Sequence, residues 1–280
     1  MHYGTYSKFI CPAPKNALRH PQAGCRPLII GLERKMPRIK LTVAYKGTNY
    51  CGFQIQPNQT TIEGTLNEAL TALTGTPTAV IGASRTDSGV HALGNVAVFD
   101  TDMQIPAQKV AYALNARLPH DIVVTASEEV PDTFHPRKCV SEKTYEYRIL
   151  NTKFPNPLIA DITHFYHYDL DVQKMQAAAA YLVGEHDFTA FCSAKTATQT
   201  NVRTVFDITV KRKEDTVTVR VTGNGFLYNM VRIIAGTLIE VGNGRRTPES
   251  VKEALESRDR NASGPTAPAC GLTLIGIKYQ

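Results

Sequence analysis

The segment with the clearest chemical content runs Gly82-Ala-Ser-Arg-Thr-Asp-Ser-Gly-Val-His-Ala92. Strand-like residues lie on either side of it, and Gly89 permits a tight return between them. Asp87 is then presented at the tip of a turn, next to Thr86 and close to Arg85. A carboxylate held there can act as a nucleophile or stabilise a developing positive charge. An isolated aspartate in a turn more often accepts hydrogen bonds from its own backbone, so this segment alone leaves both roles open.

A second candidate is Arg232, the one charge in the apolar run Met230-Val-Arg-Ile-Ile-Ala235. A guanidinium buried without a partner is costly, so Arg232 either reaches solvent or pairs with an acid. Tyr145 lies in the alternating segment 144–150, where a tyrosine is most often a half-buried strand residue. These residues are far apart in the sequence, so only the fold can bring them together.

The segment around Asp87 resembles the G-R-T-D-x-G-V-H-A motif of the tRNA pseudouridine synthases of the TruA family. Further resemblances follow in order along residues 36–280, and many ordered matches are more specific than one short pattern. They are Tyr45-Lys-Gly-Thr-Asn-Tyr-Cys-Gly-Phe-Gln54, Asn115-Ala-Arg-Leu-Pro119, Phe134-His-Pro-Arg137, Lys143-Thr-Tyr-Glu-Tyr-Arg148, Gly184-Glu-His-Asp-Phe-Thr-Ala-Phe191, Phe226-Leu-Tyr-Asn-Met-Val-Arg-Ile-Ile-Ala-Gly236 and Pro268-Ala-Cys-Gly-Leu272. Residues 1–35 match nothing in the family.

The resemblance implies an α+β protein with the pseudouridine synthase fold. Two similar, ferredoxin-like halves would join in one sheet, with a positively charged RNA-binding cleft between them. Residues 36–140 would form the half with the catalytic aspartate, and residues 141–280 the other half. The implied activity is an isomerase that converts uridine to pseudouridine in tRNA without cofactor or metal, at positions 38, 39 and 40 of the anticodon stem-loop. The implied partners are tRNA and, in a homodimer, a second copy of the chain.

The same resemblance assigns roles to four residues. Asp87 is the catalytic aspartate, whether it attacks the sugar, attacks the base or promotes a glycal intermediate. Arg232 is the active-site arginine that pairs with Asp87 and lowers the pKa of its carboxyl, so that the carboxylate stays ionised. Tyr145 contacts the target base, and Arg85 helps to hold or replace the flipped nucleotide.

The chain departs from the family pattern at three positions near these residues. Ser84 stands where glycine is usual, Ser88 where alanine is usual, and Lys46 where aspartate is usual. Serine is small, so we expect Asp87 still to be presented at the tip of its turn.

Strands and helices alternate around these motifs, which favours two similar α+β units packed together. Strands are expected over 39–45, 78–83, 95–100, 121–126, 144–150, 205–210, 217–221 and 272–279. Helices are expected after a capping box at Thr60 and Glu63, after Pro106, from Asp171 to a stop at Gly184, over 226–241, and after Thr247-Pro248. The two halves show no residue-level repeat.

The charge is unevenly placed along the 280 residues. The chain has 31 Lys and Arg against 25 Asp and Glu, a net charge of +6, but residues 1–35 alone carry six basic residues and one acid. Residues 36–280 are therefore close to neutral, and a polyanion must be held by local clusters. Three basic clusters are candidates, although each could equally be a solvated loop end: Arg137-Lys138, Lys211-Arg-Lys213 and Arg245-Arg246.

Residues 1–35 contain four prolines and show no periodicity. The favoured interpretation is a flexible N-terminal extension, or a start codon placed too far upstream with Met36 as the true beginning. A basic arm that touches RNA and a targeting peptide are the alternatives.

Other features indicate a cytoplasmic protein without a metal site. Six cysteines are scattered without a C-x-x-C pair, which is typical of reduced thiols. His164 and His167 are close in an alternating stretch, where odd spacing sends them to opposite faces. No apolar run approaches the ~18 residues that span a bilayer, and no secretory leader is visible.

Three alternatives to the tRNA enzyme remain at this stage. One is a pseudouridine synthase that acts on other RNA, and another is an RNA-binding or folding-assistant protein that has lost catalysis. Without the resemblance, an aspartate-nucleophile hydrolase would be an outside possibility. Asp87, Tyr145 and Arg232 favour an enzyme, because binding alone does not need them.

Overall fold

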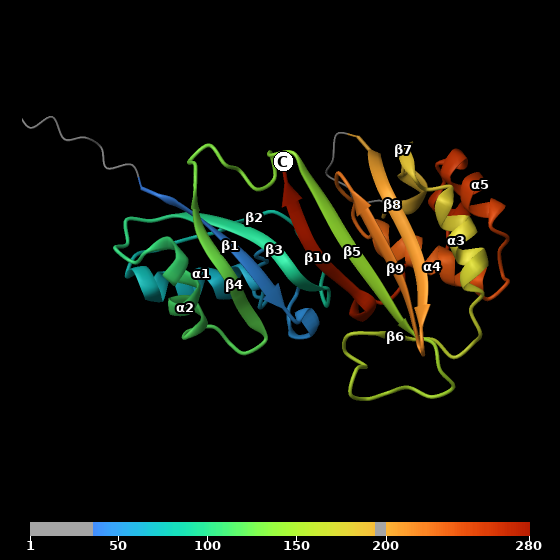
Figure 1. Cartoon of the computed structure of the whole chain (residues 1–280), viewed down its shortest axis with the longest axis horizontal. Coiled ribbons are helices and arrows are strands. Elements are labelled where there is room, and N and C mark those ends of the chain that lie inside the picture. Colours follow the sequence, from blue (N-terminus) through green and yellow to red (C-terminus); the bar gives the residue numbers. More distant parts are fainter. Residues whose placement is uncertain (1–35, 194–199) are drawn as a thin grey trace, which may run out of the picture. The chain divides into compact units, whose positions relative to one another are not determined.

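One mixed sheet organises the protein in the computed structural model, which describes residues 36–193 and 200–280 (Figure 1). Its strands are β1 (Arg38–Tyr45), β2 (Ile81–Gly82), β3 (His91–Asp100), β4 (Ile122–Val130), β5 (Ser141–Leu150), β6 (His164–Phe165), β7 (Gly184–Asp187), β8 (Val202–Lys213), β9 (Thr216–Gly223) and β10 (Leu272–Tyr279). Within the described residues they pair in the order β4-β1-β3-β10-β5-β9-β8-β7, with β2 on β3 and β6 on β5. The expected α+β class with one joined sheet is confirmed.

Five α-helices accompany the strands over the described residues. They are α1 (Ile62–Thr74), α2 (Val110–Asn115), α3 (Val172–Ala180), α4 (Met230–Gly242) and α5 (Glu249–Ser257). Helix α4 is buried on nearly all sides, as its almost continuous apolar sequence requires. Gly236 allows a close approach there, since a Cβ atom would lie 1.9 Å from the carbonyl oxygen of Pro265. None of the described helices is long and apolar enough to cross a membrane.

The last strand, β10, joins the two expected halves. It lies in the middle of the sheet, between β3 and β5 (Figure 1). Its pairing with β5 is antiparallel and long, whereas its parallel pairing with β3 involves only Thr273 opposite His91 and Leu274 opposite Ala92. The expected boundary between residues 140 and 141 falls in the link from β4 to β5 and stays a prediction. The expected N-terminal extension, 1–35, lies outside the described residues.

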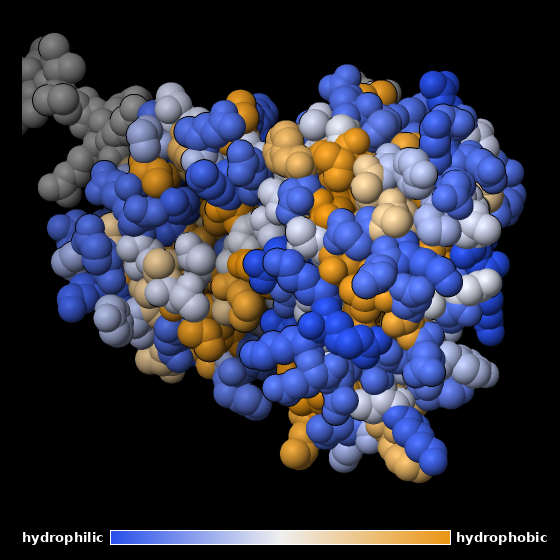
Figure 2. Space-filling model, turned by 45° about the vertical axis from the view of Figure 1, so that its right-hand side comes forward, coloured by the Kyte–Doolittle hydropathy of each residue, from blue (hydrophilic) through white to orange (hydrophobic). Residues whose placement is uncertain are grey.

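Hydrophilic residues cover much of the molecular face in Figure 2, which includes the open side of strands β5, β9 and β8. The strand period of two explains this: Val217, Val219 and Val221 of β9 are buried, while Arg220 between them is exposed. Arg220 and Arg148 both bind the buried carboxylate of Glu146 on this open side. The apolar alternate residues pack instead toward the helices.

Several expected element bounds were wrong, each for a local reason. The N-cap of α1 is Thr61, which accepts a hydrogen bond from the Gly64 N–H, so the capping residue lies one position after Thr60. The strand expected over 78–83 shrinks to Ile81–Gly82. Helix α3 ends at Ala180 and not at Gly184, which has a φ of 114° and begins β7.

The asparagine Asn229 delays the start of α4 relative to the expected range 226–241. Its backbone is left-handed, with a φ of 61°, so residues 226–229 form a loop and the helix begins at Met230. This loop faces the cavity described below.

Candidate active site

Asp87 lies in the turn between β2 and β3, and neighbouring backbone holds that turn tightly. The Val90 N–H donates to the carbonyl oxygen of Asp87, and the Phe53 N–H donates to that of Thr86. Gly52 makes the second contact possible: its φ is 87°, and a Cβ atom there would lie 2.7 Å from the Thr86 oxygen. The 47–53 segment therefore supports the turn from one side.

Asn95, on β3, holds the start of this turn through hydrogen bonds to the backbone of Ser84. This side chain is fully buried, and its Nδ2 donates to the carbonyl oxygen of Ser84 at 3.0 Å and to the Tyr45 hydroxyl at 3.1 Å. Its Oδ1 accepts from the Ser84 N–H at 3.3 Å, and the Tyr45 and Thr86 hydroxyls are 2.8 Å apart. Asn95 was not among the residues predicted for the site. The signal in the sequence is an amide within an apolar strand, because a buried amide needs hydrogen-bond partners.

Arg232 projects from the first turn of α4 toward Asp87. Its Nε donates to the carbonyl oxygen of Ala267 at 2.8 Å and its Nη1 to Asn229 Oδ1 at 2.8 Å. The same Nη1 lies 3.5 Å from Asp87 Oδ2, so the expected ion pair is present. Two neutral acceptors thus hold the guanidinium in place, and the carboxylate is its charged partner.

Two opposing influences act on the carboxyl of Asp87. Burial raises its pKa, while the Arg232 guanidinium lowers it by charge and by hydrogen bonding. The net direction is upward. The expectation that Arg232 would lower the pKa is right for its own contribution, but burial outweighs that contribution.

Tyr145 and Lys143 reach the same site from β5. Tyr145 is 9% exposed, and its ring meets that of Phe226 edge to face, with centroids 5.3 Å apart. Burial raises the pKa of Tyr145 to about 12; the Ser84 hydroxyl opposes this shift, and the charge of Asp87 adds to it. The Nζ of Lys143 donates to the carbonyl oxygen of Ala83 at 3.1 Å, and burial lowers the pKa of Lys143 to about 8, helped by the charge of Arg137.

Asp87, Tyr145 and Lys143 line one cavity of about 860 Å³, and Arg232 lies behind Asp87 without lining it. The wall of this cavity also includes the exposed side chain of Arg85. A cavity of this size suits a small-molecule or nucleotide ligand. Arg85, Arg137 and Lys143 bring three cations to a wall whose one described acid is Asp87, so the cavity attracts anions although residues 36–280 are nearly neutral.

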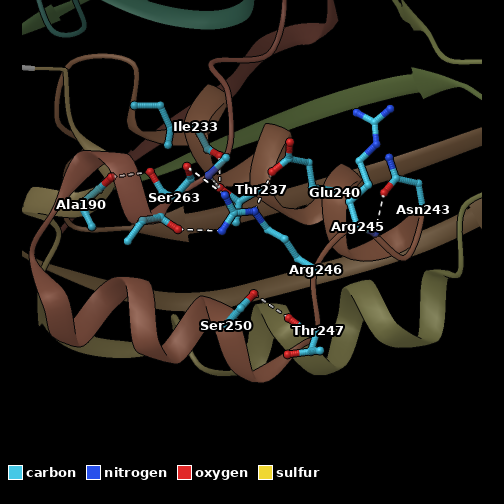
Figure 3. A network of polar contacts seen from close by, with 12 residues as sticks. Ala190, Ile233, Thr237, Glu240, Asn243, Arg245, Arg246, Thr247, Ser250 and Ser263 are labelled. Carbon is cyan, nitrogen blue, oxygen red and sulfur yellow. Dashed lines mark hydrogen bonds and ion pairs between the residues drawn. The ribbon is translucent and has the colours of Figure 1, made fainter.

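The three expected basic clusters differ in their surroundings. Arg137 lines the cavity. Arg212 instead binds Asn151 Oδ1 and the carbonyl oxygen of Leu170. Figure 3 shows Arg246 turned inward, where its Nε lies 2.6 Å from Glu240 Oε2 and its Nη1 donates to the Ala262 carbonyl oxygen. Arg246 is therefore paired with an acid inside the fold, whereas Arg212 is exposed and keeps its charge beside two neutral acceptors.

The two histidines of the expected pair differ in their local structure. Only His164 lies in a strand, the two-residue β6, and its ring packs edge to face against Tyr147. Among the described residues, no group of three His, Cys, Asp or Glu side chains is placed to hold a metal ion.

Fold and site together define an α+β enzyme with a partly buried carboxylate–guanidinium pair whose carboxylate lines a cation-lined, nucleotide-sized cavity. Comparison with known proteins is more specific. The family model described as tRNA pseudouridine synthase matches residues 41–137 and 178–280. The tRNA pseudouridine synthase A of Brevibacillus brevis is 49% identical over 248 residues, which cover 87% of this chain and 100% of that protein.

Other relatives are similar to the same extent. The tRNA pseudouridine synthase A of Thermoanaerobacter sp. is 46% identical over 244 residues, which cover 87% of this chain and 100% of that protein. The Bacillus subtilis protein of that name is 45% identical over 245 residues, which cover 87% of this chain and 99% of that protein. The chain belongs to the tRNA pseudouridine synthase family, whose members are isomerases that convert uridine to pseudouridine in tRNA.

Proposed function

We propose that this protein isomerises uridine to pseudouridine at positions 38, 39 and 40 of the tRNA anticodon stem-loop, with Asp87 as the catalytic carboxylate. The observation that carries the proposal is the 3.5 Å pair of Asp87 and Arg232, because the carboxylate of this pair lines the same cavity as Tyr145 and Arg85. Three segments distant in the sequence meet there. The position in the anticodon stem-loop is the family's expectation.

The reaction breaks the N1–C1′ glycosidic bond of uridine and forms a C5–C1′ bond, while the proton on C5 leaves and N1 gains one. A stacked uridine must first leave its stem, and the cavity provides room for the flipped nucleotide. The Asp87 carboxylate serves as a nucleophile at C1′, as a base that removes the C2′ proton while the N1–C1′ bond breaks to give a glycal, or as a nucleophile at C6 of the uracil ring. Tyr145 contacts the base in all three routes.

Arg232 keeps the carboxylate available, because its charge opposes the rise in pKa that burial causes. Arg85, exposed at the cavity wall, occupies or holds the place that the flipped nucleotide leaves. The chain's own side chains supply this chemistry, and we expect no cofactor to be required. The homodimer, in which a second copy of the chain is the partner, stays a prediction from the sequence that light scattering checks. The cytoplasmic location also stays a prediction, and cell fractionation checks it.

Tritium release from tRNA that carries 5-tritiated uridine tests the catalytic assignment, because the C5 proton leaves in every route. The wild-type protein should release tritium, and Asp87→Asn should slow release by at least about 1,000-fold, as expected for loss of an essential catalytic group. Equal rates for both proteins would remove Asp87 from catalysis. Substrates with a single labelled position among 38, 39 and 40 show which uridines are converted.

A further inference from the structure

Ser84 carries a hydroxyl that the folded protein leaves without a partner. The residue is 4% exposed, and its Oγ is buried from solvent yet makes no hydrogen bond of ordinary geometry with the described residues. Such buried hydroxyls are rare in folded proteins and call for an explanation. The backbone does not explain it, since Asn95 satisfies both the N–H and the carbonyl of Ser84.

The neighbour of this hydroxyl is the phenol of Tyr145. Ser84 lines the active-site cavity, and its hydroxyl is close enough to Tyr145 to lower the pKa of that phenol. Among the described side chains that line the cavity, Ser84 is the one with a buried hydroxyl that lacks a partner. This hydroxyl and the Tyr145 phenol therefore lie together beside the carboxylate of Asp87, whose charge also acts on Tyr145.

We propose that Ser84 is a positioning residue for Tyr145, and that the two hydroxyls hydrogen-bond when the target nucleotide fills the cavity. The proposal rests on the proposed function. The Asn95 bonds hold the Ser84 backbone still, so only a rotation about χ1 of serine and a small shift of the phenol are needed. The hydroxyl is a departure from the family pattern that the motifs resemble, in which glycine is usual at this position.

The first test compares Ser84→Ala with the wild type in single-turnover tritium release at saturating tRNA. We expect the rate to fall about 3- to 10-fold, which corresponds to the loss of one modest hydrogen bond. The tRNA concentration that gives half-saturation should stay within about twofold of the wild-type value. Ser84→Thr, which keeps the hydroxyl, should restore most of the rate. An unchanged rate in Ser84→Ala, with the wild type active, overturns the inference and leaves the proposed function standing.

A double-mutant cycle shows whether Ser84 acts through Tyr145. In the Tyr145→Phe background, which lacks the phenol oxygen, Ser84→Ala should cause no further loss of rate. Additive losses would mean that Ser84 acts elsewhere and would overturn the proposal. A structure of the Asp87→Asn protein with bound tRNA gives a second measurement: Ser84 Oγ and Tyr145 Oη should lie within about 3.2 Å of each other, and a separation above 4 Å overturns the proposal.

Thermal unfolding separates this role from a structural one. Ser84→Ala should unfold at the wild-type temperature or slightly above it, because no protein hydrogen bond is lost. Ser127→Ala is the matched control: its buried hydroxyl donates to the Ala107 carbonyl oxygen and accepts from the Ala111 N–H, far from the cavity wall. That variant should unfold at a lower temperature but keep the wild-type rate. A loss of stability in Ser84→Ala equal to that control would overturn the proposal.

Discussion

Asp87 sits where burial and a neighbouring cation act in opposite directions on one carboxyl. Burial raises its pKa, and Arg232 limits the rise. An active-site carboxylate gains reactivity from partial burial only if it stays ionised, and here one guanidinium at 3.5 Å provides the opposing charge. Arg232 is in turn held by Ala267 and Asn229, so its position does not depend on Asp87.

Replacing Arg232 should therefore affect catalysis more than folding or binding. In Arg232→Ala we expect the rate at saturating tRNA to fall about 100-fold or more, since a fixed charge beside the reacting carboxylate is lost. Affinity for tRNA should change by no more than about threefold, because Arg232 is mostly buried beside Asp87. Rate and half-saturation are measured separately by single-turnover kinetics. Weak binding with a normal rate would instead assign Arg232 to RNA positioning.

Lys143 makes a prediction about pH. Its pKa is lowered to about 8, so its ammonium is charged below that pH and becomes neutral as the pH rises through it. Because Lys143 lines the cation-rich cavity, the apparent affinity for tRNA should weaken between about pH 7 and 9, beyond the change seen in Lys143→Met. Filter binding with Asp87→Asn protein, which leaves the uridine unconverted, measures this. Parallel curves of affinity against pH for the proteins with Lys143 and with Lys143→Met would contradict this prediction.

At the scale of elements, the turn that presents Asp87 depends on a strand residue and not on the turn's own sequence. Asn95 connects Ser84 and Tyr45, so its removal leaves several buried polar groups without partners. We expect Asn95→Ala to lower the free energy of unfolding by about 2–4 kcal/mol and to slow tritium release at a temperature where it is still folded.

The control for this variant is Asn115→Ala. Asn115 also binds backbone with both amide atoms, to Val124, but it lies outside the cavity wall. Because Asn115 is exposed and Asn95 fully buried, Asn115→Ala should lose less free energy of unfolding and should keep the wild-type rate. If both variants lose rate equally, Asn95 has no special influence on the turn.

Elements with strong local signals could be predicted from the sequence, and those set by distant contacts could not. The alternation of β1 and the Asp171 N-cap, whose Oδ1 accepts from the Lys174 N–H, both appear as expected. The loop before α4 was missed: asparagine adopts the left-handed region more readily than most residues, but the apolar pattern over 226–241 does not reveal that Asn229 does so. At the site, the motif resemblance named Asp87 and Arg232, but the support from Asn95 depends on pairing between strands that periodicity does not reveal.

At the scale of the whole molecule, the placement of charge matters more than its total. Of the net charge of +6, residues 1–35 carry six bases against one acid, while residues 36–280 gather cations locally, at Arg85, Arg137 and Lys143. The family match begins only at residue 41, and each relative described above matches 87% of this chain over 99% or more of its own length. Those relatives therefore match without most of this basic segment.

Deleting residues 1–35 should consequently leave tRNA modification largely intact. We expect the protein that starts at Met36 to release tritium within about threefold of the full chain at 0.15 M salt, since the described cavity cations and the Asp87–Arg232 pair are all retained. At lower salt the full chain should gain affinity relative to the shortened one, because six additional bases attract RNA without sequence preference. Salt titrations of both proteins measure the two slopes. A loss of activity above about 30-fold on deletion, at every salt concentration, would show that the basic segment takes part in binding or positioning the tRNA and that charge in the cavity is insufficient.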